Sequence, residues 1–112
     1  MARVVISSPA DADTAAILID LATKAGVNTA AKYDRLFDRL YGRLADHPAS
    51  GPRRPALGPD TRIGIVSPYI VIYDYSEGDD TVTILRIVHG HRDITRKLLG
   101  NRGSKSQGQV TL

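Results

Sequence analysis

The chain contains no cysteine and no tryptophan, and only one phenylalanine and one methionine among its 112 residues. The absence of cysteine excludes disulfides and thiolate metal sites. No apolar run approaches the roughly 18 residues that a membrane-spanning helix needs, and the first residues lack the apolar stretch and cleavage site of a secretory signal. These absences, together with a length near that of a typical domain, predict a soluble cytoplasmic protein. Nothing in the sequence requires a metal or a cofactor.

Charge is distributed unevenly along the chain. Residues 1–50 balance, residues 51–82 carry a net charge of −2, and residues 83–112 carry +5 because six Lys or Arg face one Asp. A basic end of this size suits an anionic partner, either nucleic acid or an acidic protein segment. We expect residues 1–99 to form one domain. Residues 100–112, rich in Gly, Ser, Gln and Asn, are expected to form a flexible basic tail.

The first half of the chain predicts a strand followed by two helices. Residues 3–7 are rich in Val and Ile, as strands are. Ser8-Pro9 is typical of a helix start and Gly26 of a helix stop. Asn28 can cap a second helix, whose apolar residues recur at spacings of three and four and so share one face: Tyr33, Leu36, Phe37, Leu40, Tyr41 and Leu44. The short connection predicts an antiparallel helical hairpin.

The second half predicts three antiparallel strands. Proline and glycine interrupt residues 48–59, and residues 62–66, 69–75 and 82–88 then have strand character with short turns between them. Residues 93–99 can add a short helical piece. The fold class is therefore α+β: strand, helix, helix and three antiparallel strands, with the hairpin packed on one face of a small sheet. The other face should stay partly open, and it is the natural place for a site.

Charged and titratable groups gather where the last strand ends. Residues 86–94 read Arg-Ile-Val-His-Gly-His-Arg-Asp-Ile, and such clusters on a rigid strand end are a common way to build a site. The simpler interpretation is a polar turn, in which His89 and His91 bond backbone or Asp93. Arg86 alternates with Val82, Ile84 and Val88, so it can share their face and form a structural salt bridge with Asp74.

A second group of cations lies on the second predicted helix. Arg35, Arg39 and Arg43 stack at four-residue spacing along one face. A solvated surface, partly neutralised by Asp34, Asp38 and Asp46, explains this row most simply. In the loop that follows, Arg53 and Arg54 also read as a solvated pair.

From residue 3 to residue 94 the chain resembles toxins of the RelE/ParE superfamily, the toxic half of type II toxin–antitoxin systems. The resemblance rests on short segments in a fixed order: Ser8-Pro9-Ala10, Ala25-Gly26, residues 44–48, residues 51–58, Tyr69 with Tyr73, and Arg86-Ile87 followed by residues 89–94. It implies a small acidic antitoxin, ParD-like, that folds on the toxin, and therefore a hetero-oligomer.

Two mechanisms occur in this superfamily. RelE-type members cut messenger RNA on the ribosome with basic residues of the exposed sheet face. ParE-type members poison DNA gyrase by binding. Placed on this chain, two ribonuclease positions match, at Arg62 and Arg92. Three do not, because Gly64, Ile70 and Leu98 occupy them.

Cleavage by a 2′-hydroxyl needs a base, an acid and cations against the phosphate, and Gly64 and Ile70 supply none of these. The resemblance, together with these missing residues, therefore implies a ParE-like toxin that binds DNA gyrase and is not an enzyme. The alternative is a ribosome-dependent mRNA endonuclease that uses His89, His91, Arg62 and Arg92, because histidine can change its charge near neutral pH. A third possibility is a non-toxic relative that only binds antitoxin. The candidate residues for target or antitoxin binding are Arg62, Arg86, His89, His91, Arg92, Asp93 and Arg96.

Overall fold

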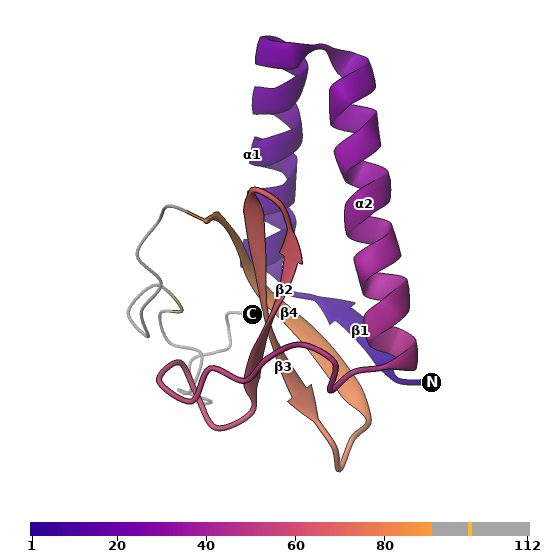
Figure 1. Ribbon diagram of the computed structural model, residues 1–112, viewed down its shortest axis with the longest axis vertical. Helices are drawn as coiled ribbons and strands as arrows, with labels where there is room; N and C mark the ends of the chain where they lie inside the picture. The colour runs from indigo at the N-terminus through magenta and orange to yellow at the C-terminus, as the bar shows by residue number, and fades with distance from the viewer. Residues whose placement is uncertain (91–98, 100–112) are drawn as a thin grey trace.

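The protein, described here by a computed structural model at residues 1–90 and 99, forms a helical hairpin on a four-stranded sheet (Figure 1). The order along the chain is β1 (Arg3–Ile6), α1 (Ser8–Ala25), α2 (Val27–Asp46), β2 (Thr61–Val66), β3 (Tyr69–Ser76) and β4 (Thr81–His89). The strands lie in the sheet in the order β1-β4-β3-β2. The α+β class and the order of elements predicted from the sequence are confirmed.

The sheet is mixed. β2 pairs with β3 and β3 with β4 in antiparallel fashion, whereas β1 lies parallel to β4, with Arg3 opposite Thr81 and Ile6 opposite Ile84. β1 therefore covers only the first part of β4. Beyond Ile84 this edge of β4 meets the start of α1 instead.

A β-bulge in β4 changes which residues share a face. Ile72 lies opposite Arg86 and Tyr73 opposite Ile84, so Leu85 is the extra residue. Val82, Ile84 and Ile87 pack in the core under the helices, whereas Leu85 and Val88 pack on the other face. The prediction that Val82, Ile84 and Val88 share one face with Arg86 is therefore wrong, because simple alternation does not continue through a bulge.

The helix α1 begins at a different cap from the predicted one. Ser7, and not Ser8, is the N-cap: its Oγ accepts a hydrogen bond from Ala10 N at 3.2 Å, and Pro9 lies in the first turn. The helix stops at Gly26, as predicted, with φ at +95°. Gly26 also precedes α2, which starts at Val27 without a side-chain cap, so Asn28 does not serve as its cap.

Helix α2 supplies most of the helical side of the core. Phe37, Leu40 and Leu44 are buried, as their spacing predicts. Leu40 packs so closely over β2 that a Cβ added at Gly64 would lie 3.1 Å from its methyl groups. Figure 1 shows the hairpin extending past the sheet, so the far ends of both helices contact mainly each other.

The face of the sheet away from the helices has its own apolar cluster. Leu57, from the loop between α2 and β2, packs there with Ile63, Ile72 and Val88, and Leu99 packs against them. The sequence predicted a partly open face. The structure places Leu57 and Leu99 on it, because the loop folds back: Arg54 N donates to Thr61 O at 2.8 Å and Ile63 N to Pro52 O at 3.1 Å.

Within the described residues, no helix is both long enough and apolar enough to cross a membrane.

Tyr41 gives the fold a testable response to alkaline pH. Burial raises its pKa to about 12, and neighbouring Asp38 and Asp34 add to the shift. Its hydroxyl is buried and has no hydrogen-bond partner of good geometry within the described residues, although Thr14 lies close enough to oppose the rise in pKa. The folded protein therefore favours the protonated form of the Tyr41 phenol.

We expect Tyr41→Phe to leave the free energy of unfolding at neutral pH nearly unchanged. At high pH, the variant should lose less stability than the parent chain as the pH rises. The pKa of Tyr41 in the folded protein is raised above the ordinary value of 10.0. The stability that depends on the protonated phenol is therefore fully present below about pH 10 and is lost as the pH rises toward 12. Partial burial limits it to about 1–2 kcal/mol. Urea unfolding at several pH values measures it, with Tyr33→Phe on the same helix as control. Equal alkaline slopes for Tyr41→Phe and the parent chain would contradict this assignment.

Candidate functional site

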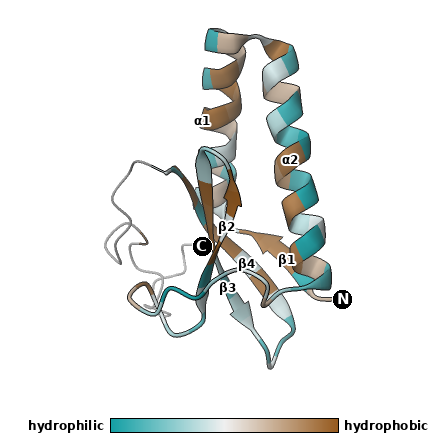
Figure 2. Ribbon diagram, in the orientation of Figure 1, coloured by the Kyte–Doolittle hydropathy of each residue, from teal (hydrophilic) through white to brown (hydrophobic). Residues whose placement is uncertain are grey.

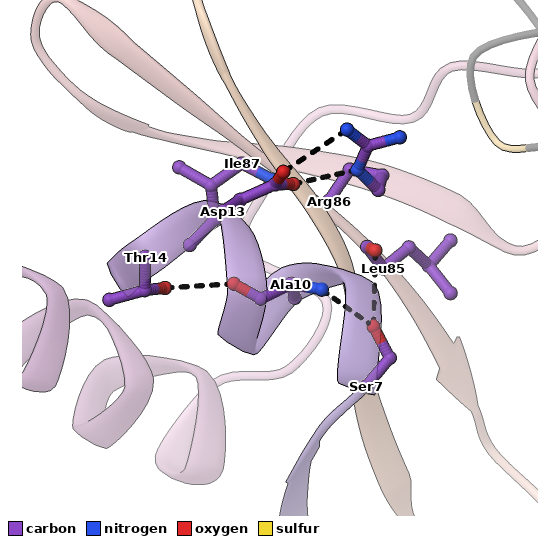
Figure 3. A network of polar contacts seen from close by, with 7 residues as sticks. All are labelled: Ser7, Ala10, Asp13, Thr14, Leu85, Arg86 and Ile87. Atoms are coloured by element: carbon purple, nitrogen blue, oxygen red, sulfur yellow. Dashed lines mark hydrogen bonds and ion pairs between the residues drawn. The ribbon is translucent and has the colours of Figure 1, made fainter. Parts of the chain in front are cut away.

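A network of polar contacts joins the first turns of α1 to β4 (Figure 3). Asp13 is its centre. Arg86 donates from Nε to Asp13 Oδ2 at 2.6 Å and from Nη2 to Asp13 Oδ1 at 3.1 Å, so the pair is bidentate. The Ile87 amide also donates to Asp13 Oδ2, at 3.0 Å. The hydrogen bonds with Asp13 raise the pKa of the Arg86 guanidinium above its ordinary value.

This network completes the edge of β4 where β1 has ended. Ser7 N donates to Ile84 O at 3.0 Å and Ser7 Oγ to Leu85 O at 3.1 Å, which extends the pairing by one residue beyond the strand. Further along the same edge, Asp13 accepts a hydrogen bond from the amide of Ile87. A strand edge left with free amides and carbonyls next to a helix would lose the hydrogen bonds that water supplied. The start of α1 replaces the missing strand.

Arg86 therefore has a structural ion pair, as the sequence suggested, but with Asp13 of α1. The sequence analysis named Asp74 on β3 as the partner. Asp74 instead accepts a hydrogen bond from Thr61 Oγ1 at 2.6 Å. No sequence pattern marked Asp13 as more than a first-turn carboxylate, because its contact with Arg86 spans 73 residues of chain.

An open cleft of about 340 Å³ lies beside this network, between α1 and the end of β4. Asp13, Asp20 and Ile17 of α1 form one wall, and Tyr69 and His89 form another. The His89 ring packs edge-on against Tyr69 with the ring centroids 5.9 Å apart. Burial raises the pKa of Tyr69. The cleft thus combines two carboxylates with an exposed histidine over apolar side chains.

Arg62 lies at the opposite end of the sheet from His89. Tyr69 is paired with His89 and with Val66, whereas Arg62 is paired with Tyr73, four residues further along β3. That spacing separates Arg62 from His89 by about 13 Å along the strands. Arg62 Nη1 donates to Ala49 O at 3.0 Å and to Gly51 O at 2.8 Å, so its guanidinium holds the loop after α2.

The positions compared with ribonuclease residues fall on different faces of the sheet. Gly64 faces the helix side, against Leu40. Ile70 packs in the apolar cluster of the other face. Four further candidates, His91, Arg92, Asp93 and Arg96, lie outside the described residues, as does the predicted tail. Among the residues described, His89 and Asp13 line the same cleft, whereas Arg62 lies apart from both.

The described part of the cleft offers groups that can recognise a ligand. Its carboxylates can accept hydrogen bonds from a cationic or amide group, and its apolar floor can bury one side chain. No group of three or more His, Cys, Asp or Glu side chains suited to a metal ion occurs in the parts of the chain that the structure describes.

A second buried polar arrangement was missed by the sequence analysis. Tyr73 is fully buried, and its hydroxyl donates to Pro48 O at 3.0 Å and accepts from Gly51 N at 3.1 Å. Burial raises its pKa, although the Gly51 amide opposes the shift. Together with Arg62 it ties the loop after α2 to the sheet. The only signal of this arrangement in the sequence is the presence of Pro48 and Gly51, residue types that favour a defined loop conformation.

Comparison with known proteins places these observations in one family. Residues 4–94 match the family described as the ParE toxin of the type II toxin–antitoxin system parDE. No curated protein matched the chain.

Solved structures share the fold. A chain of the chromosomal ParDE toxin–antitoxin system from P. aeruginosa is similar with a TM-score of 0.66 and 22% sequence identity, over 80% of this chain and 96% of that one. A chain of the RelBE2 toxin–antitoxin complex from Mycobacterium tuberculosis is similar with a TM-score of 0.55 and 22% identity, over 79% of this chain and 96% of that one.

The family match spans all six helices and strands described above and agrees with the resemblance carried by the sequence segments. The two solved structures, each 22% identical to this chain, show that the fold is shared. The chain belongs to the ParE toxin family of type II toxin–antitoxin systems.

Proposed function

We propose that this protein arrests growth as a ParE-type toxin that binds DNA gyrase and does not cut RNA. The observation that carries the proposal is the separation of Arg62 from His89. RNA cleavage needs a proton-transfer group and a cation at one phosphate. About 13 Å of strand lies between these two groups, and the Arg62 guanidinium already holds two backbone carbonyls.

The face of the sheet that a ribonuclease would use also argues for binding. Leu57 and Leu99 pack over it, with Ile63, Ile72 and Val88 beneath. An apolar cluster gives no stabilisation to the charge that grows on a phosphate during cleavage. The family match adds its own weight, because it is to the ParE branch.

We also infer a cognate antitoxin as a partner, because one similar structure comes from a toxin–antitoxin system and the other is a toxin–antitoxin complex. The described surface has aliphatic side chains that such a partner could bury: Val5 and Ile6 on the edge strand β1, and Ile19 on α1, are 39%, 44% and 68% exposed. The excess of +5 in residues 83–112 favours an acidic antitoxin segment.

The test of target choice is made with purified toxin and in cells. Stoichiometric toxin should inhibit supercoiling by DNA gyrase, and addition of the antitoxin should restore it. Induced expression should switch on the DNA damage response while messenger RNA stays intact. His89→Ala, which removes the only described histidine of the cleft, should remain toxic.

The opposite pattern would support the endonuclease. Cleaved messages on ribosomes, undisturbed supercoiling and loss of toxicity in His89→Ala would together overturn the gyrase proposal. Harmless expression of the folded chain, with antitoxin binding retained, would also overturn it and identify a non-toxic relative.

A further inference from the structure

The outer flank of α2 bears a row of four cations: Lys32, Arg35, Arg39 and Arg43. All four side chains are exposed. At a rise of 1.5 Å per residue the row extends about 16 Å along the helix axis. Figure 2 shows hydrophilic residues along this helix.

Two of the three acidic residues of α2 lie on a different side of the helix from the basic row, whereas Asp46, the last residue of the helix, lies on the side of the row. Asp34 and Asp38 immediately precede Arg35 and Arg39, so the acidic pair lies about 100° from the basic row. The acidic pair acts on Tyr41, which lies near Thr14 of α1, and is therefore on the α1 side. The basic row lies on the flank away from α1.

This arrangement is unfavourable for the helix alone. Arg35, Arg39 and Arg43 are neighbours at four-residue spacing, where like charges repel and opposite charges stabilise. Within the described residues no ion pair relieves them, since those found join Lys24 to Asp20 and Arg86 to Asp13. Asp46, three residues after Arg43, does not pair with it either. Asp38 also lies three residues after Arg35, a spacing at which opposite charges attract, and no ion pair joins these two within the described residues either. A row of like charges that the fold leaves without ion pairs favours a surface kept for binding.

The chemistry of the flank selects the partner. Apart from its first residue Val27, α2 has no exposed large apolar side chain. A protein interface needs an apolar centre, which this flank lacks. Arginine forms paired hydrogen bonds with phosphate, and a straight row of such groups fits a backbone with regularly spaced charges. Double-stranded DNA offers one charge per 3.4 Å of each strand, or about five along this row.

We propose that the Lys32–Arg35–Arg39–Arg43 flank of α2 binds the phosphate backbone of duplex DNA without reading its sequence. The proposal does not depend on the toxin's target. It gives the chain a second surface, apart from the cleft at His89, that can hold it on DNA.

Fluorescence anisotropy of a labelled 20-base-pair duplex, titrated with the full chain at several salt concentrations, tests the proposal. With four phosphate contacts, the logarithm of the binding constant should fall with the logarithm of the salt concentration at a slope near −3.6. Arg35→Gln/Arg39→Gln/Arg43→Gln should weaken binding at 50 mM salt at least tenfold and bring the slope near −1. Its midpoint of thermal unfolding should not fall, since the repelling row is removed.

The matched control removes the same charge elsewhere. Arg3→Gln/Lys24→Gln/Arg54→Gln changes exposed cations on β1, on α1 and in the loop before β2, and should weaken binding less than threefold. Equal losses in both variants would overturn the proposal, because binding would then follow net charge or residues beyond the described ones. It would also be overturned by tighter binding of single-stranded RNA or of a polyglutamate peptide, or by no binding of DNA at 50 mM salt.

Discussion

Replacing Asp13 with alanine should lower the free energy of unfolding by about 3 kcal/mol, since it removes one partner of a largely buried ion pair and, with it, two charge-assisted hydrogen bonds to Arg86. Asp13 and Arg86 are only 18% and 23% exposed. The substitution also strips the Ile87 amide of its acceptor, and an unpaired amide next to a packed helix adds to the loss. Of a total stability of about 5–15 kcal/mol, this is a large share.

Related variants divide the effect between charge and hydrogen bond. Asp13→Asn keeps one oxygen for the Ile87 amide and should lose about half as much. A double-mutant cycle with Arg86→Ala should show a coupling of about 1–3 kcal/mol, measured by urea unfolding. Asp20→Asn on the same helix is the control. Asp20 and its ion-pair partner Lys24 have side chains that are 55% and 73% exposed, respectively. Asp20→Asn should therefore change the free energy of unfolding by less than about 0.5 kcal/mol. An Asp13→Ala chain as stable as Asp20→Asn would contradict the role of Asp13 in closing the β4 edge.

Replacing Gly51 with alanine should destabilise the protein by about 3 kcal/mol or more, because backbone and a buried ring occupy the space that a methyl group would need. The added Cβ would lie near the Ile63 carbonyl oxygen, and 2.6 Å from Tyr73 Oη. Neither can withdraw easily: Ile63 is in a paired strand, and the Tyr73 hydroxyl holds both Pro48 and Gly51. The loop after α2 would have to move off the sheet.

Gly42→Ala is the matched control, with the opposite expected sign. Gly42 lies within α2, and nothing lies within 4 Å of an added Cβ. Alanine there should raise stability by about 0.5–1 kcal/mol, because glycine is the poorer helix former. Thermal and urea unfolding of the two variants give the comparison. If Gly51→Ala unfolds at the same urea concentration as the parent chain, the loop is not packed as described.

Local patterns were enough to predict the elements of this fold. The three- and four-residue spacing of Phe37, Leu40 and Leu44 set the buried face of α2, and apolar runs with short turns set the three antiparallel strands. Gly26 ended the first helix as expected. These features depend on neighbours close in the chain, and such information is carried by the sequence itself.

The helix caps show where local reasoning becomes imprecise. Ser7 and Ser8 are equally good caps by residue type, and the choice of Ser7 follows from its bond to Leu85 on β4. Asn28 is likewise a good cap by type, but Gly26 already ends one helix and turns directly into the next. A contact outside the helix decides between local alternatives of similar energy.

The site was predictable only in part for a related reason. His89 and Arg86 were both identified at the end of β4, but the partner of Arg86, the pairing of β1 with β4 and the place of Arg62 were not. Each depends on residues tens of positions apart, and a single bulge at Leu85 was enough to move Val88 to the other face. Residue types show which groups can ionise or bond, but not which of them meet.

The sequence alone therefore determined the fold class, the family resemblance and the charge distribution of this protein, since these follow from composition, periodicity and short segments in order. Tertiary structure alone decided that Asp13 closes the edge of β4, that Arg62 ties down a loop, and that Leu57 and Leu99 pack on the helix-free face. The physical reason is that hydrogen bonds and ion pairs are short-ranged, so their partners are fixed only when packing brings distant segments together.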